Sequence, residues 1–208
     1  MHDKERINNM KNAVVFGAAG HTGKYITRRL MRSDDIRLTA FVRGPKKFED
    51  MDITGVNVVC GDALNEADVK KAMEGQDILV CSLEGDVLTM AKNIVSALKV
   101  TSVKRIIWIT GMGIHHEITG PRGIMLNMYA KKRPEYIKAA DLIAESRAVT
   151  SLLRCPGIQG GDNEKYGLTT EKEQPAHRNV DRSAIAQCIA DMTEDESLGA
   201  NESLGITN

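Results

Sequence analysis

Three glycines at intervals of three residues give the clearest chemical signal in the chain. Gly17, Gly20 and Gly23 lie in the stretch GAAGHTG, between the apolar run from Ala13 and a helix-like stretch. The start of a helix offers free backbone N–H groups and the positive end of the helix dipole to a phosphate. Glycine keeps side chains out of that space and permits a tight turn. The pattern predicts that the pyrophosphate of a dinucleotide binds at Gly17, Ala19, Gly20, His21, Thr22 and Gly23.

The spacing of these glycines leaves one alternative open. The spacing is GxxGxxG rather than GxGxxG. The alternative is a purely structural turn, because glycine-rich turns also join strands to helices without binding a ligand. The dinucleotide interpretation is favoured because the turn follows an expected strand and opens an expected helix in the first β-α-β unit. His21 is expected to contribute its backbone N–H rather than to act as a base.

Basic residues follow the second expected strand, at residues 37–42. An Asp or Glu near this point typically holds the adenosine ribose of NAD, whereas an Arg favours the extra phosphate of NADP. Here Arg43 follows the strand directly and Lys46 comes shortly after it. The sequence therefore predicts that NADP(H) is preferred over NAD(H). The alternative is that these residues form a solvated basic loop.

Two further strand ends are expected to border the same cofactor. Asp62 and Ala63 follow the third expected strand, and Asp62 could either cap local N–H groups or contact the adenine. Ser82 and Leu83 end the fourth expected strand and would border the middle of the cofactor. The carboxyl ends of parallel strands meet at one edge of a sheet, so we expect all of these residues to lie together.

The elements that must position these residues follow from the alternation of apolar runs with amphipathic stretches. This alternation predicts an α/β fold, with a doubly wound parallel sheet between two layers of helices in a single domain. The 208 residues are enough for about one domain. Nearly continuous apolar runs predict strands at 12–17, 37–42, 56–60, 77–82, 104–110 and 149–154. Helices are expected at 21–33, 65–75, 86–101, 134–147 and 181–194.

The expected domain covers residues 12–208, after a loose polar arm at 1–11. Its two longest connections, 111–133 and 156–180, leave the carboxyl ends of the fifth and sixth strands, where open α/β sheets bind ligands. We therefore expect these loops to form a small substrate site.

Composition excludes several classes of function. Lys and Arg together number 28, as do Asp and Glu, so no global positive field is available to attract nucleic acid or an anionic membrane. The apolar runs are far shorter than the roughly 20 residues that cross a bilayer. The four cysteines are widely separated and lack metal-site spacing, so we expect no metal site, unpaired thiols and a reducing cytoplasm. The oligomeric state stays open.

The ordered series of motifs resembles an atypical short-chain dehydrogenase/reductase family, that of NmrA-like and biliverdin-IXβ (flavin) reductase-like NAD(P)-binding proteins. The matching stretches are GAAGHTG, FVRGPKK, VVCGDALNEADVKKAMEGQDILVCS, KRIIWITGMGI and TSLLRCPG. The resemblance implies a Rossmann-like domain that binds NAD(P), commonly NADPH. It also places Pro156, Gly157 and Ile158 beside the nicotinamide.

The resemblance also identifies where catalytic residues are expected. Members with the ordinary short-chain chemistry carry a Ser or Thr after the fifth strand and a Tyr-x-x-x-Lys pair before the sixth, in which the Tyr donates a proton and the Lys lowers its pKa. Thr110 stands at the hydroxyl position, although it could be an ordinary strand end. The two positions of the pair fall at Lys132 and Tyr136, in reversed order. Pro134 is expected to begin a helix and to leave Lys132 outside it.

These observations favour an NADP(H)-dependent oxidoreductase, with Thr110 and Tyr136 as its candidate catalytic residues. The missing Tyr-Lys pair argues against the reduction of sugar or alcohol carbonyls. It argues less against the reduction of a small planar acceptor such as a flavin or quinone, which can receive a hydride while solvent supplies the proton. The alternative is a non-catalytic redox sensor that binds NADP(H) and regulates a partner. A relative of nucleotide-sugar epimerases and dehydratases ranks last, because such substrates normally need a further C-terminal lobe.

Overall fold

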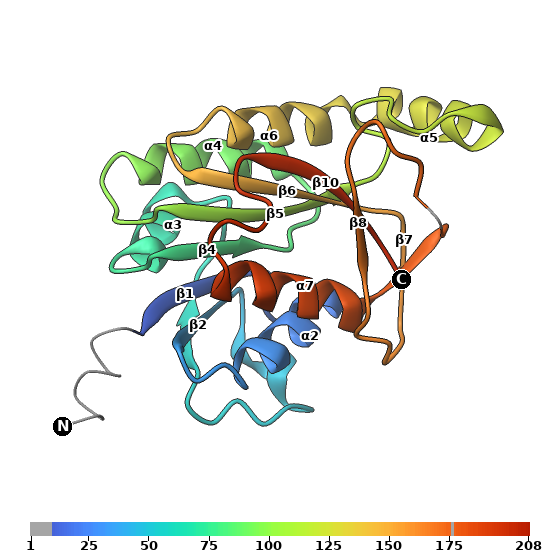
Figure 1. Cartoon of the computed structure of the whole chain (residues 1–208). Helices are drawn as coiled ribbons and strands as arrows, with labels where there is room; N and C mark the ends of the chain where they lie inside the picture. The colour runs from blue at the N-terminus through green and yellow to red at the C-terminus, as the bar shows by residue number, and fades with distance from the viewer. Residues whose placement is uncertain (1–9, 176) are drawn as a thin grey trace.

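The centre of the protein is an eight-stranded sheet, shown in Figure 1. The computed structural model describes residues 10–175 and 177–208. The strand order is β3-β2-β1-β4-β5-β6-β10-β8, and every pair is parallel except β10 with β8. The strands are β1 (Lys11–Phe16), β2 (Ile36–Val42), β3 (Asn57–Cys60), β4 (Ile78–Cys81), β5 (Arg105–Gly111), β6 (Val149–Cys155), β8 (Gly167–Thr169) and β10 (Glu202–Thr207).

Helices cover both faces of this sheet. On one face α2 (His21–Leu30) packs against α7 (Arg182–Glu194). On the other face α4 (Val87–Leu98) packs between α3 (Glu66–Met73) and α6 (Pro134–Ala144). The remaining elements are α5 (Gly120–Lys132), the short 3-10 helix η1 (Pro45–Phe48), and a parallel ribbon of β7 (Gly157–Gln159) and β9 (Asn179–Asp181).

Two apolar cores explain why the strands read as continuous hydrophobic runs. Neighbouring residues of β1 face opposite layers: Val15 packs in the core beneath α2 and α7, and Val14 packs in the core beneath α3, α4 and α6. Both side chains are fully buried. A fully buried Val or Ile stabilises the fold by about 1.5–3 kcal/mol, so each strand contributes to both layers. The predicted three-layer, doubly wound α/β fold is therefore confirmed.

The arrangement of the strands defines where a ligand can bind. The chain places β2 and β3 on one side of β1, and β4, β5 and β6 on the other. In open α/β sheets the crevice at such a reversal, beyond the carboxyl ends of the strands, is the ligand site. Here it lies between the ends of β1 and β4, beside the glycine-rich turn.

The structure adds elements that the sequence pattern does not predict. Segment 111–133, expected as a loop, contains α5, because Pro121 occupies the first turn of a helix, where proline needs no N–H partner. Segment 156–180 contains β7, β8 and β9. In β10, Gly205 interrupts the apolar pattern, but a Cβ there would lie 2.6 Å from Thr169 Oγ1 of β8. The glycine thus permits the close pairing of these two strands.

The predicted arm at 1–11 falls mostly outside the described residues, since only its last two positions are included. Lys11 already belongs to β1, and its ammonium donates to the Thr193 carbonyl at 3.0 Å. Within residues 10–175 and 177–208, none of the helices has the length and apolar character needed to cross a membrane. Cys60 is exposed, Cys81, Cys155 and Cys188 are buried, and all four are free thiols.

Candidate functional site

The turn between β1 and α2 depends on its glycines. Gly17 has a φ of +78°, and a Cβ on it would lie only 2.1 Å from the Ser82 carbonyl oxygen at the end of β4. The Gly20 N–H donates to the Gly17 carbonyl at 2.9 Å and closes the turn. A Cβ on Gly23 would lie 2.0 Å from that same carbonyl oxygen, so Gly23 allows α2 to start against the turn. Side chains at these positions would push the helix away from the sheet.

The start of α2 is open to an anion. The N-cap residue Gly20 has no capping side chain, and the first turn contains no acidic residue. The first helical hydrogen bond runs from the Lys24 N–H to the Gly20 carbonyl, so the N–H groups of residues 21–23 have no acceptor within the helix. Free N–H groups and the helix dipole favour a phosphate at this point, so the turn fits the pyrophosphate of a dinucleotide.

A cavity of about 430 Å³, here called the first cavity, opens directly in front of this turn. Most of the predicted cofactor residues meet there, although they come from the ends of β1, β2, β3 and β4 and from β7. Those that line it are Gly17, Ala19, Gly20, His21, Thr22, Arg43, Asp62, Ala63, Ser82, Leu83 and Ile158. Phe41, Val42, Gly61, Glu84, Met90 and Arg182 also line it and were not predicted.

The other predicted cofactor residues lie outside the first cavity. Gly23 packs behind the turn, Lys46 is exposed in η1, and Pro156 lines a neighbouring cavity. Gly157 lines neither cavity and instead packs against Asn179, whose Oδ1 would be 2.5 Å from a Cβ on Gly157. The Asp62 Oδ1 accepts the Leu64 N–H at 3.0 Å, as predicted for a local cap. Asp62 also lines the first cavity, and its contact with the adenine stays a prediction.

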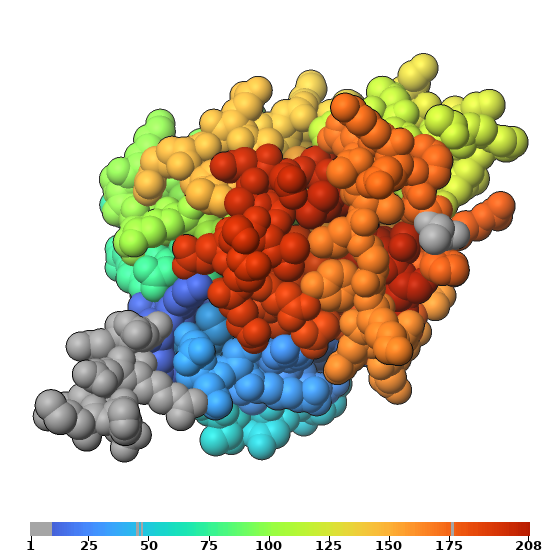
Figure 2. All heavy atoms as spheres, in the orientation of Figure 1, coloured from blue at the N-terminus to red at the C-terminus, as the bar shows by residue number. Residues whose placement is uncertain are grey.

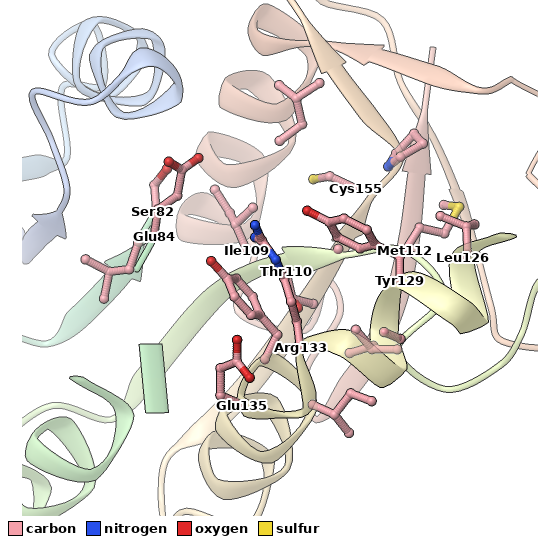
Figure 3. Close-up of a pocket in the computed structure, with 18 of the residues that line it drawn as sticks. Ser82, Glu84, Ile109, Thr110, Met112, Leu126, Tyr129, Arg133, Glu135 and Cys155 are labelled. Atoms are coloured by element: carbon pink, nitrogen blue, oxygen red, sulfur yellow. The ribbon is translucent and has the colours of Figure 1, made fainter. Parts of the chain in front are cut away.

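A second cavity of about 770 Å³ adjoins the first. Thr22, Ser82, Leu83, Glu84 and Ile158 line both cavities, and we call these five residues the shared wall. The rest of the second cavity comes from the ends of β5 and β6, from α5 and from the start of α6. Figure 3 shows side chains from these elements around one space, Ile109, Met112, Leu126 and Tyr129 among them. The lining mixes aliphatic, aromatic and polar groups, as a site for a small planar molecule requires.

Both predicted catalytic residues line this second cavity. The Thr110 side chain is 6% exposed, and its Oγ1 is buried without a hydrogen-bond partner in the described residues. The Tyr136 hydroxyl accepts the Gly85 N–H at 3.4 Å, beside the end of β4. An unpartnered buried hydroxyl is uncommon, which makes Thr110 a candidate for binding a ligand in the cavity that it lines.

The cation beside Tyr136 is an arginine rather than a lysine. The Arg133 guanidinium carbon lies 5.0 Å from the Tyr129 ring centre and 5.7 Å from the Tyr136 ring centre. Both distances are in the range of cation–π contacts. Lys132 lines the cavity, but α5 ends at this residue and α6 begins at Pro134. In the described part of the chain no hydrogen bond joins Lys132 to Tyr136, although both residues line the cavity.

A buried ion pair fixes one wall of the second cavity. Glu117 and Arg154 are paired, and each side chain is only 1% exposed. Glu117 also accepts the N–H groups of Gly113 at 2.8 Å and His115 at 3.1 Å. Burial raises the pKa of the Glu117 carboxyl, but the N–H groups of Gly113 and of Glu117 itself, together with Arg154, outweigh burial, and the pKa is lowered overall. The pair therefore anchors the backbone that carries Met112 and Ile114 into the cavity.

Cys155 lines the second cavity but does not supply a reactive thiolate. Burial raises the pKa of its thiol, which therefore stays protonated at neutral pH.

The chain matches a model of an NAD(P)H-binding family over residues 17–196. It therefore belongs to that family, and the resemblance to the NAD(P)-binding atypical short-chain dehydrogenases/reductases is confirmed. A Rossmann-fold NAD(P)-binding family protein from Shigella flexneri shares 30% identity with this chain. Its structure aligns with a TM-score of 0.80 over 96% of this chain and 94% of that protein.

Two curated relatives are enzymes by name. The chain is 29% identical to 2-alkyl-3-oxoalkanoate reductase of Shewanella oneidensis over 80% of its own length and 44% of that protein. It is 28% identical to quinone oxidoreductase 2 of Escherichia coli K12 over 67% of its length and 46% of that protein. The chain thus spans about half the length of the curated relatives it matches.

The unpredicted lining residues differ in how far the sequence could have indicated them. Phe41 and Val42 end β2, so their position at the carboxyl edge could have drawn attention to them. Arg182 begins α7, which packs against α2, and no local pattern indicates that contact.

Proposed function

We propose that the protein is a cytoplasmic NADP(H)-dependent reductase that transfers a hydride to a small planar acceptor, such as a flavin or a quinone. One observation carries this proposal: the first cavity, which begins at the glycine-rich turn, shares a wall with a larger, mixed apolar and polar cavity. A dinucleotide that extends along the first cavity brings its reactive end to this shared wall. The second cavity then holds the acceptor beside it.

The first cavity supplies the groups that a dinucleotide phosphate ester needs. The free N–H groups of residues 21–23 would hold the pyrophosphate, and Arg43, at the carboxyl end of β2, would lie where this fold places the adenosine ribose. Arg43 forms no ion pair with a described residue, and so its guanidinium is available to the 2′-phosphate that distinguishes NADP from NAD. Lys46, exposed in η1, adds positive charge nearby without lining the cavity.

The second cavity suits a flat, conjugated acceptor. Segment 111–133 contributes Met112, Leu126 and Tyr129, and segment 156–180 contributes Ile158. Thioether and aromatic side chains adapt to planar ligands at low conformational cost. Preorganised placement of the acceptor against the coenzyme accounts for most of the rate enhancement in such a site.

Bound NADPH supplies the hydride, and residues of the chain orient the acceptor. The Thr110 hydroxyl, which is buried without a partner, donates to an oxygen or nitrogen of the acceptor. The Tyr136 hydroxyl borders the same space and keeps the Gly85 backbone in place. An electron-poor ring needs no positioned strong acid, because water can supply the proton. The arrangement is therefore suited to flavin or quinone reduction better than to reduction of an unactivated ketone. The names of the two curated relatives, a quinone oxidoreductase and an oxoalkanoate reductase, support reduction in general.

Steady-state oxidation of NADPH by the purified protein tests this proposal. We expect turnover with at least one member of a panel of flavins and quinones, and faster turnover with NADPH than with NADH. Lack of oxidation above background for every acceptor would refute the reductase.

A non-catalytic redox sensor is the second candidate, and the absence of a Tyr-Lys pair favours it. It predicts coenzyme binding without turnover and a partner protein that is captured in only one redox state of the coenzyme.

A further inference from the structure

Arg182 is the second arginine of the first cavity, and it comes from the opposite end of the chain to the glycine-rich turn. It is the first residue of α7, and it lines the cavity together with Gly17, Gly20 and Thr22. In Figure 2, α7 and segment 156–175 lie side by side on one face of the molecule. Since α7 packs along α2 and both helices begin at the carboxyl edge of the sheet, their first turns approach the same space.

The surroundings of Arg182 leave its charge unpaired. Its Nε is buried without a hydrogen-bond partner, and no carboxylate of the described residues lies within ion-pair distance of its guanidinium. The adjacent acid, Asp181, is already engaged: its Oδ1 accepts from Gln159 Nε2 at 2.8 Å. Arg182 is half-buried, a guanidinium is always charged, and the removal of part of it from water without a partner is unfavourable unless a ligand supplies the negative charge.

The start of α7 is held in place around this arginine. The Ser183 hydroxyl donates to the Gly161 carbonyl at 2.6 Å. A Cβ on Gly160 would lie 3.8 Å from Arg182 Nη1, so the backbone of this segment approaches the guanidinium closely. The start of α7 is therefore tied to the segment that follows β7, which also passes beside the Arg182 guanidinium.

We propose that Arg182 binds the pyrophosphate of the dinucleotide from the side opposite to the α2 N-terminus. This inference rests on the proposed coenzyme site and adds a ligand that no sequence motif indicates. The proposal is supported by the match between the two arginines of the first cavity and the two phosphate groups of NADP(H), the 2′-phosphate and the pyrophosphate. Arg43 and Arg182 are the two arginines of the first cavity, and Arg43 extends from the end of β2, beside Gly61 and Asp62. With Arg43 at the 2′-phosphate, Arg182 neutralises the two charges of the pyrophosphate together with the helix dipole.

Calorimetric titration of the full chain with NADPH, NADH and adenosine 2′-monophosphate tests this assignment. We expect Arg182→Ala to lower the affinities for NADPH and for NADH by the same factor, about ten- to hundredfold, because both coenzymes contain the pyrophosphate. Adenosine 2′-monophosphate lacks that group, so its affinity should not change. Arg43→Ala should show the opposite pattern. It should lower the affinities for NADPH and adenosine 2′-monophosphate and leave the affinity for NADH unchanged.

Two further variants make the test specific. Arg182→Lys keeps the charge but loses the planar fork, and we expect it to recover part of the lost affinity. Arg32→Ala removes an exposed arginine whose guanidinium is 3.8 Å from Glu164, and it should bind both coenzymes normally. Thermal unfolding of each variant confirms that it is folded; Arg182 Nε has no partner, so its removal should leave the fold intact.

Three results would overturn the assignment: unchanged affinity for both coenzymes in Arg182→Ala, a loss confined to NADPH, or an equal loss in Arg32→Ala. If the wild-type protein binds neither coenzyme, this proposal and the proposed function both fail. If it binds coenzyme without turnover, only the reductase is refuted, and the titrations still decide the role of Arg182.

Discussion

Replacement of Gly17 by alanine tests whether the turn after β1 is built as the structure indicates. Alanine would have to adopt a φ of +78°, which costs about 1–2 kcal/mol for a residue with a Cβ. Its Cβ would also lie 2.1 Å from the Ser82 carbonyl oxygen, and real Cβ contacts are essentially never shorter than 3.0 Å, so β4 or the turn must move by about 0.9 Å. Such overpacking adds about 1–3 kcal/mol. We therefore expect Gly17→Ala to lower the free energy of unfolding by about 2–5 kcal/mol.

Two other glycines separate the contributions to this loss. Gly75 has a φ of +69° but open space around its Cβ position, so Gly75→Ala should show the backbone contribution alone, about 1–2 kcal/mol. Gly44 has an extended backbone and open space, so Gly44→Ala should change stability little. Urea unfolding at one temperature measures all three variants.

Coenzyme affinity gives the second measurement. The displaced turn should weaken NADPH binding in Gly17→Ala, whereas Gly75→Ala, before β4 and away from both cavities, should bind normally. If Gly17→Ala unfolds like Gly75→Ala and binds NADPH like the wild type, the close contact between the turn and β4 does not exist, and the reasoning is refuted.

Four other variants give direct predictions. Arg43→Glu should weaken NADPH at least about tenfold, through loss of a charge-assisted contact and added repulsion, with little effect on NADH in the same titration; equal losses would show that Arg43 does not contact the 2′-phosphate. Thr110→Val and Tyr136→Phe should each lower kcat/KM by about two- to tenfold in the NADPH oxidation assay, the effect of one neutral hydrogen bond; a hundredfold loss in Tyr136→Phe would instead identify Tyr136 as the proton donor. Glu117→Gln should lower the free energy of unfolding by about 3–5 kcal/mol at neutral pH, because Arg154 is left buried and unpaired. The lowered pKa of Glu117 means that its contribution is present above its ordinary value of 4.5 and is lost as pH falls towards the folded-state pKa. Below pH 4.5 the free energy of unfolding should therefore fall less steeply with falling pH in Glu117→Gln than in the wild type. Equal slopes in the two proteins would contradict this role.

The sequence predicts the sheet and the turn well because both depend on local patterns. The buried strands β1, β2, β4, β5 and β6 are continuous apolar runs, and the glycines that follow β1 have their own spacing. β8 and β10 are short or interrupted by glycine, so their pairing depends on tertiary contacts that no window of sequence contains.

The candidate site divides in the same way. Gly17 and Ser82 end predicted strands and Arg43 follows one, so the fold itself brings them to one edge, and the glycine and the arginine indicate a phosphate ligand. Arg182 belongs to a helix far along the chain, and Arg133 lies at the junction of α5 and α6. Their positions follow from helix packing and from a helix end, which local residue patterns do not specify.

Under the proposed function, the shared wall makes the binding of the coenzyme and the binding of the acceptor dependent on each other. Thr22, Ser82, Leu83, Glu84 and Ile158 face both spaces, so a ligand that shifts one of them reshapes the neighbouring space as well. Thermodynamic reciprocity then requires that the coenzyme change the affinity for the acceptor by the same factor as the acceptor changes the affinity for the coenzyme. The oxidised and reduced coenzymes, which differ at the ring nearest this wall, can therefore set different affinities for the second ligand and so determine which of the two leaves first.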